Sequence, residues 1–177
     1  MRRTKLNVRP RPIALAVVAV LASLQVADAA TRNWVGGAPG GVFWDLANWD
    51  TPPVAGDDVL LGAFNTTLRS GTYSLNTVSG SGTLTLSAGT LRLAAASSLG
   101  SLALSGGVLS GPGSLALGTL AWTGGQMGEG VAGQTGGSTT VSGLVTISGA
   151  NGKNLYYGRA LNLNGGAQWS GSGSLNL

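Results

Sequence analysis

Few side chains in this sequence could do chemistry, and the carboxylates of Asp45 and Asp50 come nearest to a catalytic pair. Two carboxylates held about 5–10 Å apart across a sugar bond catalyse glycoside hydrolysis. The sequence has no His and no Cys, which excludes histidine-activated nucleophiles, thiol catalysis and the common transition-metal sites. Between residues 63 and 177 the only acid is Glu129. We therefore expect that the protein is not an enzyme, and a test of this expectation would change Asp45 and Asp50.

Aromatic side chains crowd the segment that carries these acids, and Trp34, Trp44 and Trp49 are the candidate ligand-binding residues. Three exposed indoles could form a stacking platform for a sugar or a peptide, with Asp45 or Asp50 accepting hydrogen bonds. The same rings could instead plug the first coil of a repetitive fold, because an uncovered end exposes apolar core and unpaired strand edge to water. The sequence favours the plug, because terminal repeats need caps and Trp buries a large area.

No metal and no cofactor is expected. Asp57 and Asp58 could bind calcium, but an acidic pair without further spaced acids is a weak signal, and turn formation by Asp explains it. Gly-x-Gly patterns recur throughout a chain with 31 Gly. Without a strand-to-helix context they do not indicate a dinucleotide site.

An internal repeat must position all of these side chains. The stretch LSGGVLSGPGSLAL, residues 104–117, returns as LNGGAQWSGSGSLNL, residues 163–177, with one residue added. A Leu-x-Leu pattern, whose two Leu point to one face of a strand, or a looser form of it, starts at 84, 102, 120, 141 and 161. The mean spacing is about 19 residues, at the short end of the solenoid range.

This spacing predicts an all-β fold, a parallel β-helix of about five or six coils. We expect a right-handed helix, although the spacing itself does not fix the hand. No single coil can bury its own apolar side, so the coils must stack around one inner column. We expect Leu86, Leu104 and Leu163 to lie above one another in that column. Trp122 is expected in the core, and Arg159 is expected to hydrogen-bond a corner carbonyl. The outward positions, which form no threonine ladder and so exclude an ice-binding face, are Thr85, Ala103, Ala121, Ser142 and Asn162.

Residues 1–29 are typical of a secretory signal peptide. Five Lys and Arg precede an apolar run from Ile13 to Leu24, and Ala27 and Ala29 are small residues at the positions that a signal peptidase reads. The run is too short to span a bilayer, and an uncleaved signal anchor is the alternative to a removed signal peptide. The sequence thus predicts a signal peptide (1–29), a Trp-rich capping module (30–62) and β-helix repeats (63–177), with no membrane span in the mature chain.

Removal of the signal peptide changes the charge balance. Residues 30–177 hold five Lys and Arg and five Asp and Glu, so the apparent basic character of the chain belongs to the removed segment. No basic patch remains, and we expect no nucleic-acid partner. An exported protein of this kind would be periplasmic, on the cell surface or secreted.

Several motifs resemble the large exported β-helical proteins of Gram-negative bacteria, the adhesin and autotransporter-passenger type. They are Trp34, the spacing of Trp44 and Trp49, AGDDVLL (55–61), LAWTGGQMGEG (120–130) and KNLYYGRALNLNGGAQWSG (153–171). The resemblance implies an extracellular, repetitive and often adhesive protein with no catalytic residues. Those proteins are usually longer, and the self-exported ones end in a membrane barrel. We therefore expect either a truncated passenger or an open C-terminal edge that pairs with another chain.

Together these features predict a non-catalytic, exported structural or adhesive β-solenoid protein. Its partners would be glycans or other surface proteins, or a second copy through the open C-terminal edge. The alternative is a carbohydrate-binding module that uses Trp34, Trp44 and Trp49. A polysaccharide-degrading enzyme is the third hypothesis.

Overall fold

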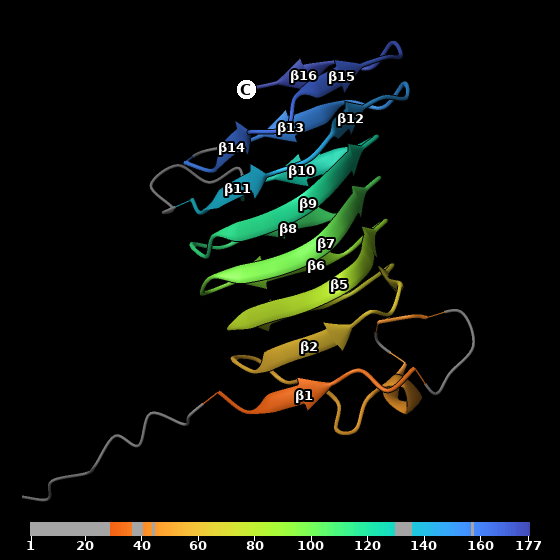
Figure 1. Cartoon of the computed structure of the whole chain (residues 1–177), viewed down its shortest axis with the longest axis vertical. Coiled ribbons are helices and arrows are strands. Elements are labelled where there is room, and N and C mark those ends of the chain that lie inside the picture. Colours follow the sequence, from red (N-terminus) through yellow and green to blue (C-terminus); the bar gives the residue numbers. More distant parts are fainter. Residues whose placement is uncertain (1–28, 37–40, 44, 130–135, 157) are drawn as a thin grey trace, which may run out of the picture.

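The computed structural model describes residues 29–36, 41–43, 45–129, 136–156 and 158–177. Within them it shows sixteen β-strands and one short 3-10 helix, η1 (Leu46–Asn48). The strands stack into a parallel β-solenoid of about six turns, which confirms the predicted all-β fold (Figure 1). Except for Ala29, the predicted signal peptide lies outside the described residues.

The strands follow one another along the chain with only short connections. They are β1 (Thr31–Asn33), β2 (Asp58–Gly62), β3 (Thr66–Leu68), β4 (Thr72–Leu75), β5 (Thr77–Leu86), β6 (Thr90–Leu93), β7 (Ser97–Leu104), β8 (Val108–Ser110), β9 (Leu115–Trp122), β10 (Gly125–Met127), β11 (Ser138–Val141), β12 (Val145–Ile147), β13 (Lys153–Leu155), β14 (Ala160–Leu163), β15 (Ala167–Trp169) and β16 (Leu175–Asn176).

Two parallel sheets form the walls of the solenoid. One sheet holds β4, β6, β8, β10, β13 and β16, and the other holds the remaining ten strands, with β1 at one end of its path and β14 at the other. Every pairing between named strands is parallel. The long strands β5, β7 and β9 each cover a stretch that other coils divide between two short strands, as in β11 and β12. A coil therefore has three strand segments.

The register of the strands shows how the length of the coils changes along the chain. Leu84 pairs with Leu102 and Leu102 pairs with Leu120, so these two coils are equally long. Leu120 then pairs with Val145 and Val145 with Ala167, so both of the following coils are longer than the earlier ones. The predicted strand starts at 84, 102 and 120 are thus in phase with one another, whereas 141 and 161 are not.

The two copies of the sequence repeat do not occupy equivalent positions in their coils. Leu86 pairs with Leu104, as predicted, but Leu163 pairs with Val141, and Val141 pairs with Leu117. The prediction that Leu163 lies above Leu104 is therefore wrong. The reason is that both walls need the same alternation of apolar and polar residues. The same sequence repeat can consequently form either wall. Its first copy contains β8 of the six-stranded sheet, and its second copy contains β15 of the ten-stranded sheet.

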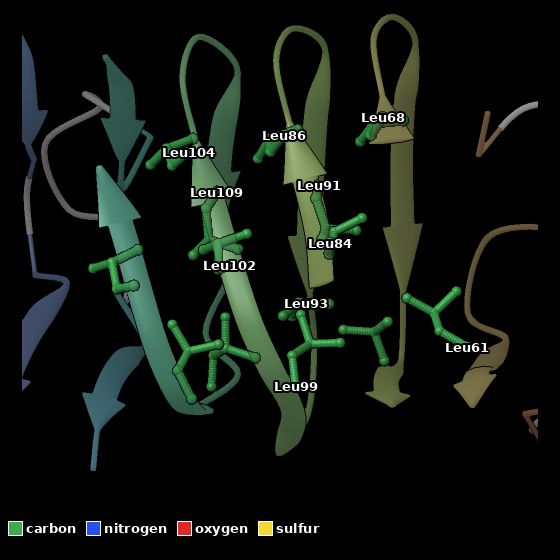
Figure 2. Packing of buried hydrophobic residues seen from close by; sticks show 14 of the residues in the cluster. Leu61, Leu68, Leu84, Leu86, Leu91, Leu93, Leu99, Leu102, Leu104 and Leu109 are labelled. Atoms are coloured by element: carbon green, nitrogen blue, oxygen red, sulfur yellow. The ribbon is translucent and has the colours of Figure 1, made fainter. Parts of the chain in front are cut away.

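Apolar side chains from both sheets point into the space between them and form one core. Leu68, Leu86 and Leu104 lie in a row in neighbouring coils, and Leu91 and Leu109 project from the opposite wall (Figure 2). All five are fully buried or nearly so. A fully buried Leu contributes about 1.5–3 kcal/mol relative to an exposed one. The predicted core position of Trp122 is confirmed, although its indole N–H has no acceptor among the described residues.

Glycine at the bend of the ten-stranded sheet lets the coils approach closely. Gly100, Gly118 and Gly143 follow one another there in successive coils. A Cβ added to Gly118 would lie 2.5 Å from the carbonyl oxygen of Gly100, and one added to Gly143 would lie 2.6 Å from that of Gly118. Any larger residue would push two coils apart, so the spacing of the coils dictates glycine at these positions.

The stack begins within the segment that the sequence assigns to a capping module. β1 and β2 lie in residues 30–62, yet they pair with each other and β2 pairs with β5 in the ten-stranded sheet. In the last coil, Leu163 and Trp169 are 42% and 50% exposed. In the described part of the chain, no helix has the length and apolar character needed to cross a membrane.

We predict that Leu102→Ala destabilises the fold by about 2–5 kcal/mol, because Leu102 is fully buried between Leu84 and Leu120 and its truncation leaves a cavity. Chemical denaturation followed by circular dichroism measures this loss. The matched control is Leu144→Ala, since Leu144 is 42% exposed; its loss should stay below about 1 kcal/mol. Equal losses in the two variants would show that the inner columns do not hold the stack.

Candidate functional site

The Trp-rich N-terminal segment folds into an aromatic cluster beside the first coil. The backbones of Trp34 and Trp49 form an antiparallel bridge, and their ring centroids lie 4.9 Å apart in a T-shaped arrangement. Phe43 packs edge-on against Trp49 at 5.1 Å and against Tyr73 of β4 at 4.9 Å. The indole N–H of Trp49 donates a hydrogen bond of 2.8 Å to the carbonyl oxygen of Phe43. Trp44 lies outside the described residues.

Burial decides what these rings can do. Trp34 and Trp49 are each only 5% exposed, and Phe43 is fully buried. A sugar stacks on an open ring face, and these rings use their faces and edges on one another and on the core. The geometry therefore favours packing over ligand binding for Trp34 and Trp49. The ligand-binding role of the set Trp34, Trp44 and Trp49 remains a prediction.

The candidate catalytic carboxylates hold turns of the backbone. Asp45 precedes η1 and accepts a hydrogen bond from the N–H of Ala47. Asp50 accepts hydrogen bonds from the side chain and the backbone of Asn33, and from the N–H of Thr51. The bonds from Asn33 in particular hold the pKa of Asp50 below its ordinary value. A general acid in glycoside hydrolysis needs a raised pKa, so Asp50 is poorly suited to that role.

The acidic pair Asp57 and Asp58 fastens the first coils together. Asp57 is buried and accepts hydrogen bonds from Arg32 of β1, at 2.7 Å, and from the N–H of Val54. Burial would raise the pKa of Asp57, but these hydrogen bonds and the charge of Arg32 lower it below the ordinary value. Asp58 accepts hydrogen bonds from Asn76 and Thr77, which are one coil on. Among the described residues no three His, Cys, Asp or Glu gather into a metal-binding group.

The outer walls of the solenoid carry uncharged side chains in register from coil to coil. Neighbouring rungs are joined by hydrogen bonds from Thr119 to Ser101 at 2.8 Å and from Asn176 to Asn154 at 2.7 Å. Three outward columns run along the walls: Thr67, Thr85, Ala103, Ala121, Thr146 and Gln168; Ser79, Ser98, Ala116, Thr140 and Asn162; and Thr72, Thr90, Val108, Gln126, Asn154 and Asn176.

These columns correct the predicted outward positions. Thr85, Ala103 and Ala121 share a column as expected, but Thr146 continues it, and Asn162 lies in a different column with Thr140. The corrected column still has no continuous row of Thr. On the six-stranded wall, Arg92 pairs with Glu129, which leaves that charge largely balanced.

Two cations are buried in the last coils. Arg159 donates to the carbonyl oxygens of Gly111 and Ser138 and to the hydroxyl of Thr139, which confirms the predicted bond to a corner carbonyl. Burial lowers the pKa of Arg159 to about 10. Lys153 is 1% exposed and donates to two carbonyls of its own loop. Sequence reasoning missed Lys153, because its position in the apolar register only appears once the strands are paired.

A hollow of about 410 Å³ lies beside Arg159 in the last coil. Leu155, Tyr156, Gly158 and Leu177 line it with Arg159. The guanidinium already bonds three acceptors of the earlier coils, so its structural role accounts for its position.

Comparison with known proteins identifies no relative of this chain. No family model matches it, and neither the curated proteins nor the solved structures gave a match.

We predict that Trp49→Ala lowers stability by about 3–5 kcal/mol, because Trp49 is buried and its removal opens the aromatic cluster. Thermal unfolding followed by circular dichroism measures the loss. The control is Leu46→Ala in the neighbouring helix η1, since Leu46 is largely exposed and its truncation should change little. Unchanged stability in Trp49→Ala together with lost glycan binding would instead identify a ligand platform.

Proposed function

We propose that this chain is a non-catalytic, exported structural or adhesive β-solenoid protein, from which residues 1–29 are removed on export. The observation that carries the proposal is the run of uncharged hydroxyl, amide and small side chains in register along the outer walls. Such columns place one uncharged side chain, most often a hydroxyl, an amide or Ala, on the wall in each coil, with a spacing of about 4.8 Å. A rigid rod that repeats weak hydrogen-bonding groups suits partners that are themselves repetitive, because many weak contacts add up when both sides are multivalent.

Charge supports the choice of partner. Residues 30–177 hold equal numbers of basic and acidic side chains, and the described ion pairs, Arg32 with Asp57 and Arg92 with Glu129, are internal. A wall without net charge neither attracts nucleic acid nor depends on salt for binding. Neutral glycans or other surface proteins are therefore the partners that we propose for the outer walls.

The last coil offers a second contact surface. Its strands β14 and β16 lie at the ends of the two sheets, and Leu163 and Trp169 are half exposed there. Residues 160–177 contain no charged residue and no Pro, which are the usual means of blunting a strand edge. Self-association through this edge is part of the proposal.

The absence of catalysis is also part of the proposal. It is supported by the structural use of both candidate catalytic carboxylates: Asp45 caps η1, and Asp50 accepts hydrogen bonds from Asn33. The resemblance to adhesins and autotransporter passengers supports the surface or secreted location, and export as far as the periplasm is the minimum that the proposed signal peptide requires.

Expression of the full chain in a Gram-negative host, followed by fractionation and intact mass spectrometry, tests the proposal. We expect the protein outside the cytosol with its first residue at Ala30, and binding of the purified protein to neutral glycans or to cell surfaces. Binding should fall at least tenfold in a variant with Lys on one outward column, such as Ala103→Lys with Ala121→Lys, while circular dichroism stays unchanged.

The matched control places Lys on another outward column of the same sheet, through Ser98→Lys with Ala116→Lys, so that the two variants together identify the binding column. Replacing Ala27 and Ala29 by Arg should leave residues 1–29 attached. An intact N-terminus in the cytosol would contradict export. An exported protein that binds neither glycans nor cells would contradict the adhesive role.

A further inference from the structure

The loop before β13 places a buried ammonium group on the peptide bond of an Asn-Gly pair. The Nζ atom of Lys153 donates hydrogen bonds of 2.8 Å to the carbonyl oxygen of Asn151 and 3.3 Å to that of Gly149. The side chain is buried, and the ion pairs of the described residues do not include it. Among the described residues, the partners of the Lys153 Nζ atom are therefore carbonyl oxygens.

The carbonyl of Asn151 belongs to the peptide unit whose nitrogen is the amide of Gly152. Removal of the amide proton spreads negative charge over the nitrogen and this oxygen. A fixed ammonium group at hydrogen-bond distance from the oxygen stabilises that charge, as oxyanion-hole donors do in enzymes. A charged donor also makes a stronger hydrogen bond than a neutral one. Lys153 thus favours the anionic form of the Gly152 amide.

The anionic nitrogen has a target within the same residue pair. The side chain of Asn151 carries a carboxamide carbon that can close a five-membered ring with the nitrogen of Gly152. Asn151 and Gly152 are exposed to water, and Gly152 has no side chain to hinder ring closure. The structure gives the N–H of Gly152 no acceptor among the described residues, so the proton is free to leave.

We propose that Asn151 is a site of self-catalysed deamidation, with Lys153 as its positioning residue. A solvent base takes the proton of the Gly152 amide, and the nitrogen forms a bond to Cγ of Asn151. The bond from Cγ to the side-chain nitrogen breaks, and ammonia leaves with one added proton. Water then opens the resulting succinimide at either carbonyl and leaves aspartate or isoaspartate at position 151. No electron is transferred, and water is the only co-reactant.

The reaction changes the charge of this loop. Hydrolysis places a carboxylate two residues before Lys153, whose Nζ atom donates to carbonyl oxygens. The reaction would also give residues 30–177 one net negative charge on an otherwise neutral rod.

The chain contains its own control for this chemistry. Asn164 and Gly165 form a second Asn-Gly pair, also exposed, in the turn between β14 and β15. The N–H of Gly165 likewise has no acceptor among the described residues. The difference is that no described cationic side chain donates to the carbonyl of Asn164. The two pairs therefore separate the effect of the ammonium group from the effect of the sequence.

Incubation of the purified full chain in mildly alkaline buffer, followed by tryptic peptide mapping, tests the proposal. Trypsin cuts after Arg92, Lys153 and Arg159, so Asn151 and Asn164 fall in different peptides. We expect Asn151 to convert about tenfold faster than Asn164, the factor that corresponds to about 1.4 kcal/mol of transition-state stabilisation. The Lys153→Met variant should remove most of this difference. In urea the two rates should become equal.

One further variant, Gly152→Ala, and the direction of the change in Lys153→Met make the result decisive. Gly152→Ala should slow conversion at Asn151 and leave Asn164 unchanged, because a Cβ at this position meets nothing nearer than 3.5 Å and the fold tolerates it. If Lys153→Met merely loosened the loop, its rate would rise rather than fall, which would overturn the proposal. Equal rates at Asn151 and Asn164 in the folded wild-type protein would overturn it too.

Discussion

Each coil of this chain hides its apolar side only because the next coil lies on it in register. A single coil has too few inward side chains to form a core, so the rows through Leu84, Leu102 and Leu120 exist only in the stack. The parallel hydrogen bonds between coils and the inward rows enforce one another, because a slip of one residue would turn every inward side chain outward. Coil spacing, glycine placement and the polarity of the walls all follow from this coupling.

The same constraint limits which side chains the stack can enclose. Between successive coils there is no room for a Cβ at Gly118 or Gly143. Where a cation enters the interior, it must find its acceptors locally, and both Lys153 and Arg159 bind backbone carbonyls of corners. In the first coils, acids join neighbouring strands. Asp57 accepts a hydrogen bond from Arg32 of β1, and Asp58 of β2 accepts one from Thr77 of β5. On the outer walls, three columns of uncharged side chains run in register from coil to coil.

Much of the architecture is predictable from the sequence, because period-2 alternation and glycine spacing are local signals. The spacing assigns Leu84, Leu102 and Leu120 to equivalent places in successive coils, and the register agrees. Phase is harder. The letter repeat assigns Leu163 to the row of Leu104, but the coil that follows Leu120 is longer than those before it, and no local pattern reports such an insertion. Most of the added length falls between Met127 and Thr139, whose partners are Leu109 and Leu115.

The candidate site is less predictable than the fold. Three Trp in a short segment could be an open platform or a packed cluster, and only the positions of the rings distinguish the two. Trp34 and Trp49 are buried, and the acids beside them hold turns. The burial of Lys153 could not be predicted from the sequence, because a lysine that follows Asn-Gly is typical of an exposed loop. Its burial depends on β13 pairing with β10, at a position where the earlier coil has Gly125.

The distance between spin labels along one wall tests the stacking most directly, and the absence of native Cys makes site-specific labelling simple. Thr67, Thr146 and Gln168 point outward in one column. Thr146 lies four coils from Thr67, and Gln168 lies five coils from it. At about 4.8 Å per step, the pair at 67 and 146 should lie about 19 Å apart and the pair at 67 and 168 about 24 Å apart, each with a narrow distribution. Broad distributions, or two distances that do not differ by about one step, would contradict a stack of coils in register.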